Sequence, residues 1–141
     1  MAEAPLVSTI IALGIIPVAF LLVHAFLSGL KGWKYHKLTG AAAVTWDLSM
    51  SVGYMIMRAL GLSIGESTLE MKGAILLYFI VHGTMSAIVI AIELGVAATG
   101  IYGWRTGKKT VWHTRLSKAL FVLWWFSFLS GEIFYLVNYV L

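Results

Sequence analysis

The sequence contains no cysteine and little charge. The absence of cysteine from its 141 residues excludes disulfides, thiolate metal sites and thiol nucleophiles. Asp, Glu, Lys and Arg make up 11% of the chain, whereas 60% of the residues are hydrophobic. A soluble domain of this size cannot bury so much apolar surface, because small proteins keep a high ratio of surface to volume. The composition therefore predicts a protein whose solvent is lipid.

Three further features are missing. No Lys or Arg precedes Lys31, so the start of the chain lacks the basic segment of a cleavable signal peptide, and we expect a retained helix there. No nucleophile elbow or phosphate-binding loop is present, which argues against a free-standing hydrolase. The Lys and Arg residues do not alternate with aromatics on an exposed face, which gives no support to nucleic-acid binding.

Four apolar runs account for most of the chain, at about 6–30, 38–62, 73–100 and 114–140. Each run has about 25 residues, which is enough to cross a hydrocarbon core of roughly 30 Å. The sequence therefore predicts an all-α integral membrane protein. We expect one domain, 1–141, folded as an up-down-up-down four-helix bundle.

Basic residues concentrate in the first and third connections, at 31–37 and 105–109, with Arg115 and Lys118 just beyond. By the positive-inside rule these connections lie on the inner side and both termini lie outside. Several Trp and Tyr residues accompany them, as in an aromatic belt at a membrane interface. We expect the cytoplasmic membrane of a prokaryote.

The second and fourth runs resemble each other. Leu38, Ala41, Val44, Trp46, Ser49 and Gly53 match Leu116, Ala119, Val122, Trp124, Ser127 and Gly131 at a fixed offset. With one residue of slack, His36 corresponds to His113. Both runs start from the inner side, so this pattern predicts a parallel repeat related by an axis along the membrane normal.

Small and polar residues recur at helical spacing in each run and are expected to face the interior. These stripes include His24 in the first run, Trp46 and Ser49 in the second, His82 and Glu93 in the third, and His113 and Trp124 in the fourth. A rise of about 1.5 Å per residue gives their depths. His36 and His113 share the inner boundary, His24, Asp47 and Glu93 lie about one to two turns deeper, and His82 and Glu132 share a level in the outer half.

Acids inside a membrane are costly, by about 2.5 kcal/mol or more for a lone carboxylate at the helix centre. Packing alone explains the glycines and serines, and a satisfied His82–Glu132 pair would need no ligand. Asp47, Glu93 and Glu132 together with the histidines exceed what packing requires. The sequence therefore predicts a functional polar core.

Neutral imidazoles without cysteine indicate haem or metal binding. Haem b needs two imidazoles at similar depth on facing helices, and His36 with His113 fits best. Arg115 and Lys118 stand beside that pair and suit the propionates. A deeper pairing through His24 or His82 stays open. The alternative is a bare copper, iron or zinc ion held by His24, Glu93 and Asp47.

The segment 78–82 ending in His82, the stretch from Arg105 to His113, the run 115–119, and Trp124, Gly131 and Tyr135 resemble the second half of the small four-helix YozB/CtaM membrane family. His36-Lys37 resembles the family's His-Arg. The resemblance implies a ligand set of His36, His82 and His113 and a link to maturation of haem-copper oxidases. The chain departs from the family late in the second helix, where Tyr54 and Met57 stand without a histidine. A helix that starts with His and a basic residue is also similar to transmembrane b-type cytochromes.

We therefore expect a membrane haem b or metal protein that serves electron transfer or assembly of a respiratory complex. Its partners would be the lipid bilayer, other membrane subunits or a second copy of the chain, and a quinone or another redox partner. Two alternatives are an accessory subunit without catalysis and a small proton-coupled transporter that uses Glu93, Asp47 and Glu132.

Overall fold

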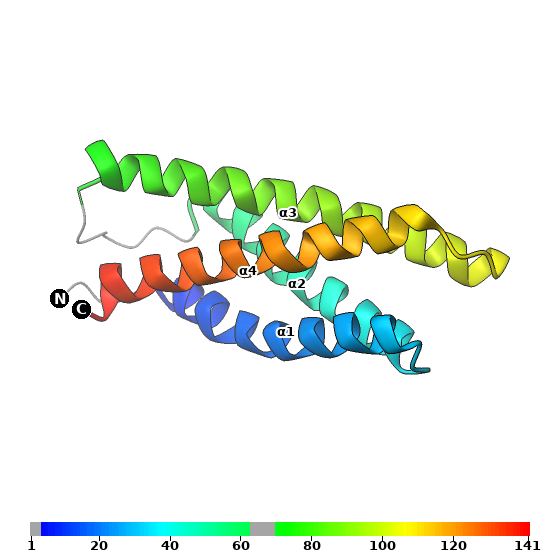
Figure 1. The fold of residues 1–141 in the computed structure, drawn as a ribbon. Coiled ribbons are helices and arrows are strands. Elements are labelled where there is room, and N and C mark those ends of the chain that lie inside the picture. Colours follow the sequence, from blue (N-terminus) through cyan, green and yellow to red (C-terminus); the bar gives the residue numbers. More distant parts are fainter. Residues whose placement is uncertain (1–3, 63–69) are drawn as a thin grey trace.

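The computed structural model describes residues 4–62 and 70–141. Within these ranges the chain forms α-helices and no strands, which confirms the predicted all-α class. The helices are α1 (Leu6–Lys31), α2 (His36–Ala59), α3 (Gly73–Thr106) and α4 (Val111–Tyr139) (Figure 1).

Glycine ends both α1 and α3 at the connections that carry the basic residues. Gly32 follows α1 with φ 66°, and Gly107 follows α3 with φ 68°. This left-handed conformation is available to glycine without a steric penalty from a Cβ atom, and it turns the chain out of a helix. The next helices begin within four residues, at His36 and Val111. Two tight helical hairpins result, α1–α2 and α3–α4.

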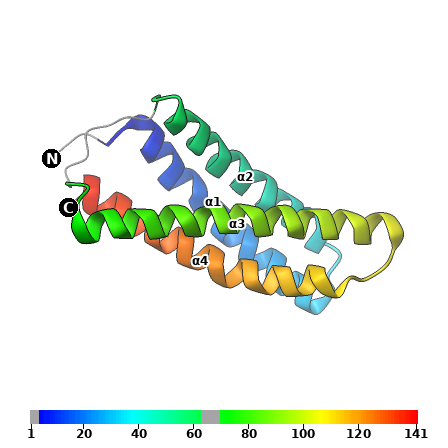
Figure 2. The ribbon, with the colours of Figure 1, turned by 90° about the horizontal axis from the view of Figure 1, so that it is seen from above.

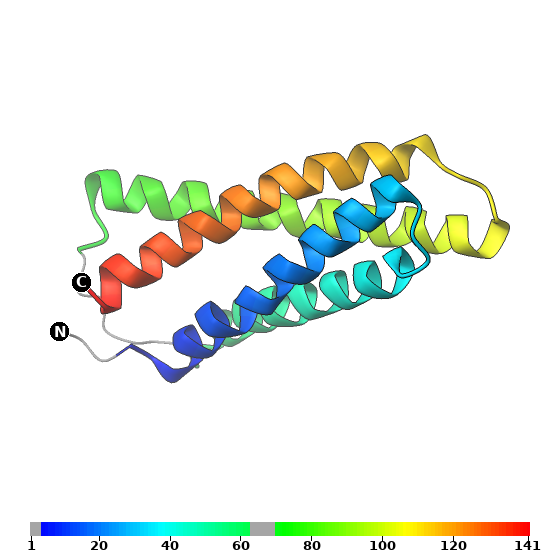
Figure 3. The same ribbon diagram turned by 60° about the horizontal axis from the view of Figure 1, so that its bottom comes forward.

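The hairpins pack side by side into a ring of four helices. α1 contacts α2 and α4, and α3 contacts α2 and α4. In the described ranges the diagonal pairs, α1 with α3 and α2 with α4, have no Cα atoms within 8 Å of each other, so they meet through side chains. Successive helices run in opposite directions, and the start of α1 lies at the same end of the bundle as the end of α4 (Figures 1, 2 and 3). The glycine-ended connections lie at the other end.

The outer surface of the bundle is apolar. Phe20 is 73% exposed and Val122 is 67% exposed, and many other large apolar side chains point outward. α1, α3 and α4 are long and apolar enough to cross a membrane. α2 has 24 residues but a more polar sequence, and it is not among those three. The chain is therefore an integral membrane protein whose exposed apolar side chains contact lipid.

The third helix is longer than predicted. We expected it to end at Gly100, whereas α3 continues to Thr106 and ends at Gly107. The six additional residues carry the α3–α4 connection beyond the α1–α2 connection (Figure 1). α2 and α4 begin two and three residues earlier than predicted, at His36 and Val111, so that His36 and His113 both belong to first helical turns.

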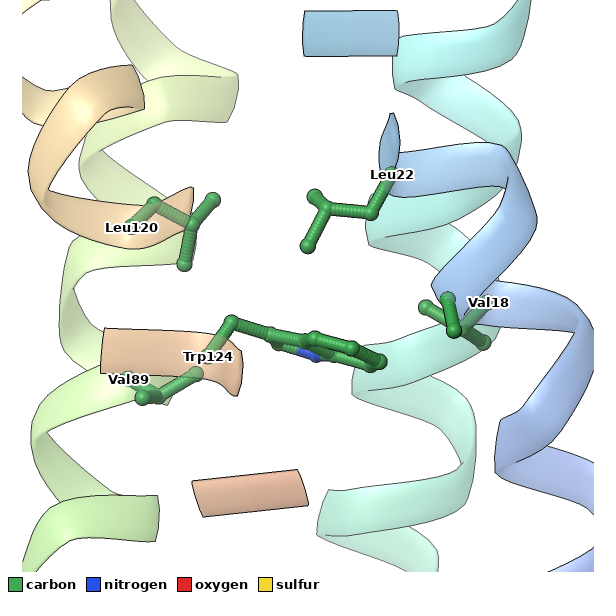
Figure 4. Packing of buried hydrophobic residues seen from close by; sticks show 6 residues of the cluster. Val18, Leu22, Val89, Leu120 and Trp124 are labelled. Atoms are coloured by element: carbon green, nitrogen blue, oxygen red, sulfur yellow. The ribbon is translucent and has the colours of Figure 1, made fainter. Parts of the chain in front are cut away.

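Apolar side chains from α1, α3 and α4 fill the centre of the bundle. Val18 and Leu22 of α1 meet Val89 of α3 and Leu120 and Trp124 of α4 (Figure 4). Trp124 is 2% exposed and extends across the interior. Closer to the glycine-ended connections, Phe26 and Phe121 stack with ring centroids 4.2 Å apart, which joins the two hairpins.

The predicted inward stripes are correct on α3 and α4 and wrong in part on α1 and α2. His24, Trp46 and Ser49 are exposed. Their sequence neighbours are buried instead, Ala25 beside His24 on α1 and Asp47 beside Trp46 on α2. Successive helical residues differ in direction by about 100°, so an error of one position turns a side chain from the interior to the lipid.

The same shift changes the register of the predicted repeat. The sequence match pairs Trp46 with Trp124, yet Trp46 is 43% exposed and Trp124 is 2% exposed. Burial matches one position earlier, where Ala43 corresponds to Leu120 and Asp47 to Trp124. This register also pairs His36 with His113. The repeat itself stays a prediction.

Candidate functional site

His36 and His113 meet at the end of the bundle that carries the glycine-ended connections. They come from the diagonal helices α2 and α4, and their ring centroids lie 6.0 Å apart with an interplanar angle of 74°. Both rings are half-buried. The helical rise per residue predicted that these two histidines lie at the same depth, and in the structure their rings lie beside each other.

Each of these histidines packs over a glycine of its own hairpin. A Cβ atom at Gly29 of α1 would lie 2.8 Å from Cε1 of His36. A Cβ atom at Gly100 of α3 would lie 3.2 Å from Cε1 of His113. The missing side chain leaves the room in which each ring sits.

The ring nitrogens facing these glycine helices contact backbone carbonyls. His36 Nδ1 lies 2.8 Å from the carbonyl oxygen of Ala25, and His113 Nδ1 lies 3.2 Å from that of Val96. Each carbonyl belongs to the residue four positions before the glycine. Thr99 Oγ1 lies 3.1 Å from His113 Nδ1 as well. The two hairpins thus hold their histidines in the same way.

These contacts fix the tautomer of both rings. A carbonyl oxygen only accepts, so Nδ1 carries the proton and donates to it. Nε2 then holds the free lone pair, and among the described residues neither ring makes a hydrogen bond through Nε2. A histidine whose Nδ1–H bonds to a carbonyl while Nε2 is free is in the form in which imidazole binds iron or zinc.

Basic side chains surround the same end of the bundle. Arg115 and Lys118 of α4 are exposed, as is Lys37 of α2. Arg115 lies over the ring of Trp112, with 5.7 Å between its guanidinium carbon and the ring centroid. Because they are exposed, these cations can meet anionic groups at this end of the bundle.

A second polar group lies in the centre of the bundle. Asp47 of α2 is 2% exposed and Glu93 of α3 is 1% exposed, and their carboxyl groups lie close enough to interact with each other. Trp124 Nε1 donates to Asp47 Oδ1 over 2.8 Å, and Ser51 Oγ donates to Oδ2 over 3.5 Å. The predicted common depth of Asp47 and Glu93 is confirmed.

The third polar group lies between α3 and α4 toward the termini. His82 Nδ1 lies 2.9 Å from Ser130 Oγ, and Ser86 Oγ lies 2.8 Å from Ser127 Oγ. His82 packs over Gly131, where a Cβ atom would lie 3.0 Å from its Cε1. The partner of His82 is therefore a serine, and no bond to the neighbouring Glu132 is among its contacts in the described ranges.

His24 does not join any of these three groups. It is exposed on α1, its Nδ1 lies 3.2 Å from Thr39 Oγ1, and its ring centroid lies 6.3 Å from that of Trp33. An open apolar groove of about 440 Å³ runs past it, lined by Ala19, Phe20, Val23, His24, Leu27 and Trp125. His24 thus belongs to the outer surface of α1.

The proposed bare-metal ligands are not assembled as predicted. Asp47 and Glu93 meet, but His24 faces outward on another helix. In residues 4–62 and 70–141, no three side chains of His, Asp or Glu lie close enough to share one ion. The error has the same origin as the stripe error, because His24 is one position removed from the buried Ala25.

Several residues of these groups were missed from the sequence. Gly29 and Thr99 contact the histidine pair, and Ser51 contacts Asp47. Trp124 was placed on an inward stripe but was not expected to hydrogen-bond with Asp47. In the sequence, each paired histidine follows a glycine of the preceding helix. The spacings are seven and thirteen residues, so they form no common pattern that would have predicted these contacts.

The fold and these polar groups define a class, a small helical membrane protein with paired histidines at one end. The chain matches no known family model, no curated protein and no solved structure in the comparisons made with each. The resemblance to the YozB/CtaM family and to b-type cytochromes therefore stays a prediction.

Proposed function

We propose that the chain binds haem b between His36 and His113 and serves electron transfer or respiratory-complex assembly in the membrane. The observation that carries the proposal is the convergence of two imidazoles from diagonal helices, each held at Nδ1 and free at Nε2. The ring centroids lie 6.0 Å apart, so His36 and His113 are close enough that both would hold one haem iron.

The number of protein donors favours haem over a bare ion. A bare zinc or copper ion takes three or more protein ligands, whereas haem iron takes its equatorial ligands from the porphyrin and needs two from the protein. The pair at this end of the bundle supplies two, and the described ranges bring no third His, Asp or Glu to it. Copper, iron or zinc held with a donor from outside the chain is the alternative.

Each part of the chain has a defined task in this proposal. Ala25 and Val96 hold the protons on Nδ1 of the two histidines, which keeps Nε2 available for iron. Gly29 and Gly100 let the rings lie close to α1 and α3. Lys37, Arg115 and Lys118 offer positive charge to propionates at the membrane boundary. The bound haem would supply one-electron redox chemistry.

The proposed orientation of the chain in the membrane rests on the basic residues at this end of the bundle. From these residues we infer that this end lies on the inner side of a prokaryotic cytoplasmic membrane, with both termini outside. The electron partner would be a neighbouring membrane subunit, a second copy of the chain or a quinone.

The test is the visible absorption of the purified protein after reconstitution with haem. We expect Soret and alpha bands in the reduced-minus-oxidised spectrum, and we expect His113→Ala and His36→Ala each to abolish the bis-histidine spectrum. His82→Ala is the matched control, since it removes a histidine of α3 that contacts Ser130 instead. Spectra unchanged in both ligand variants would reject the pair. Elemental analysis identifies a bare metal.

A further inference from the structure

Two carboxyl groups lie in contact inside the bundle with no cation beside them. Asp47 is 2% exposed and Glu93 is 1% exposed. In the part of the chain that the structure describes, the one salt bridge joins Lys72 to Glu70, outside the helices. A carboxylate inside a membrane is costly, and two adjacent carboxylates also repel each other. The pair is therefore stable only when at least one of the two negative charges is neutralised.

The hydrogen bonds around the pair indicate that a bound proton neutralises one of the two carboxylates. An ionised carboxylate only accepts hydrogen bonds, so two carboxyl groups bond to each other only when one of them carries a proton. Both oxygens of Asp47 already accept, Oδ1 from Trp124 and Oδ2 from Ser51. Glu93 instead has a buried oxygen, Oε2, that lacks a partner among the described residues. A proton on Glu93 turns its carboxyl group into the donor that the contact with Asp47 needs.

We propose that Asp47 and Glu93 form a proton-binding site at the centre of the bundle, in which Glu93 carries the proton and Asp47 is the carboxylate that accepts its hydrogen bond. Water supplies the proton as hydronium, the O–H bond forms at Glu93, and release returns the proton to water. No electron moves in this exchange. The site is distinct from the histidine pair and does not depend on haem.

The groups facing the pair are neutral. α1 contributes Leu22 and Val18 to the apolar cluster around Trp124, and α4 contributes Trp124 itself. α2 adds the hydroxyl of Ser51. The titratable groups beyond this layer lie along the bundle. His113 contacts Val96, three residues after Glu93, and His82 lies eleven residues before Glu93, about 16 Å along α3.

Three polar groups thus follow the length of α3. The serines around His82 lie toward the termini, Glu93 lies at the centre, and Thr99 with His113 lies toward the glycine-ended connections. A proton held at Glu93 occupies the middle position between the two ends of the bundle. The carboxyl pair is therefore a buried proton-binding site between the two ends of the bundle, not a pair of surface carboxylates.

Infrared spectroscopy of the full chain in lipid nanodiscs at neutral pH tests the proposal. We expect a C=O stretching band of a protonated carboxylic acid in the wild type that disappears in Glu93→Gln. In D₂O the band should shift to lower frequency, because the proton exchanges. Glu132→Gln is the matched control, since it removes another intramembrane glutamate and should leave the Glu93 band in place. Asp47→Asn should shift the band without removing it.

A label separates Glu from Asp without any mutation, which matters if a variant does not fold. Incorporation of carboxyl-¹³C glutamate into the wild type should move the band, and ¹³C aspartate should leave it unchanged. A band that follows the aspartate label places the proton on Asp47 and overturns the assignment. The absence of any protonated band means that both groups are ionised, and the absence of a D₂O shift means that the proton does not exchange. Either result rejects the proposal.

Discussion

Replacement of Gly29 by alanine tests the packing that holds His36. The new Cβ atom would lie 2.8 Å from Cε1 and 2.9 Å from Nδ1 of that ring. Carbon atoms reach their optimal separation at about 3.5–4.0 Å, so the ring must move by roughly 0.7–1.2 Å. The hydrogen bond from Nδ1 to Ala25 is 2.8 Å long, and a shift of this size breaks or weakens it.

The expected losses follow from these two effects. Overpacking of a well-packed site costs about 1–3 kcal/mol of unfolding free energy, and the weakened hydrogen bond adds about 0.5–1.5 kcal/mol. Loss of the group that orients a metal-binding histidine lowers affinity by about 10–100-fold. Gly100→Ala should have the same effect in weaker form, because its Cβ atom would lie 3.2 Å from His113.

The assay is a haem titration followed by Soret absorbance, with thermal unfolding in detergent measured in parallel. Gly53→Ala is the control, since no atom lies within 4 Å of its new Cβ atom in α2. The affinity for haem should decrease in the order Gly53→Ala, Gly100→Ala, Gly29→Ala. Equal affinities in all three variants would refute the reasoning that links the glycines to the ligand geometry.

Three further changes test other contacts. Trp124→Phe keeps the aromatic ring but removes the N–H that donates to Asp47 over 2.8 Å, and it should lower the unfolding free energy by about 1.5–3 kcal/mol; an unchanged melting curve would show that this bond contributes nothing. Ser130→Ala removes the partner of His82 and should cost about 0.5–1.5 kcal/mol while haem affinity stays constant, so a loss of haem would implicate His82 as a ligand. His24→Ala should leave both stability and the haem spectrum unchanged, because this ring faces outward, and a lost spectrum would return it to the ligand set.

The helices were predictable because lipid imposes a simple rule. Every backbone polar group in the hydrocarbon core must be satisfied within the chain, so long apolar runs form helices. The ends were less predictable. Gly100 looked like a helix end, but its role is to admit the ring of His113, and α3 stops only where Gly107 adopts a left-handed conformation.

The depths of the polar residues were also predictable, since helical rise converts sequence position into height. This rule placed His36 level with His113, and Asp47 level with Glu93. The direction in which each side chain points was not predictable to the same degree. His24 and Trp46 lie next to buried residues in the sequence, and which of two neighbours faces inward depends on packing with the other helices.

The bond between Trp124 and Asp47 has a consequence for helix rotation. It joins two diagonal helices, α2 and α4, that have no Cα atoms within 8 Å of each other in the described ranges. A turn of either helix by one residue, about 100° about its own axis, would take the indole or the carboxylate out of reach. The bond therefore fixes the rotation of both helices about their own axes. It thereby also fixes the direction in which His36 and His113 project at the end of the bundle.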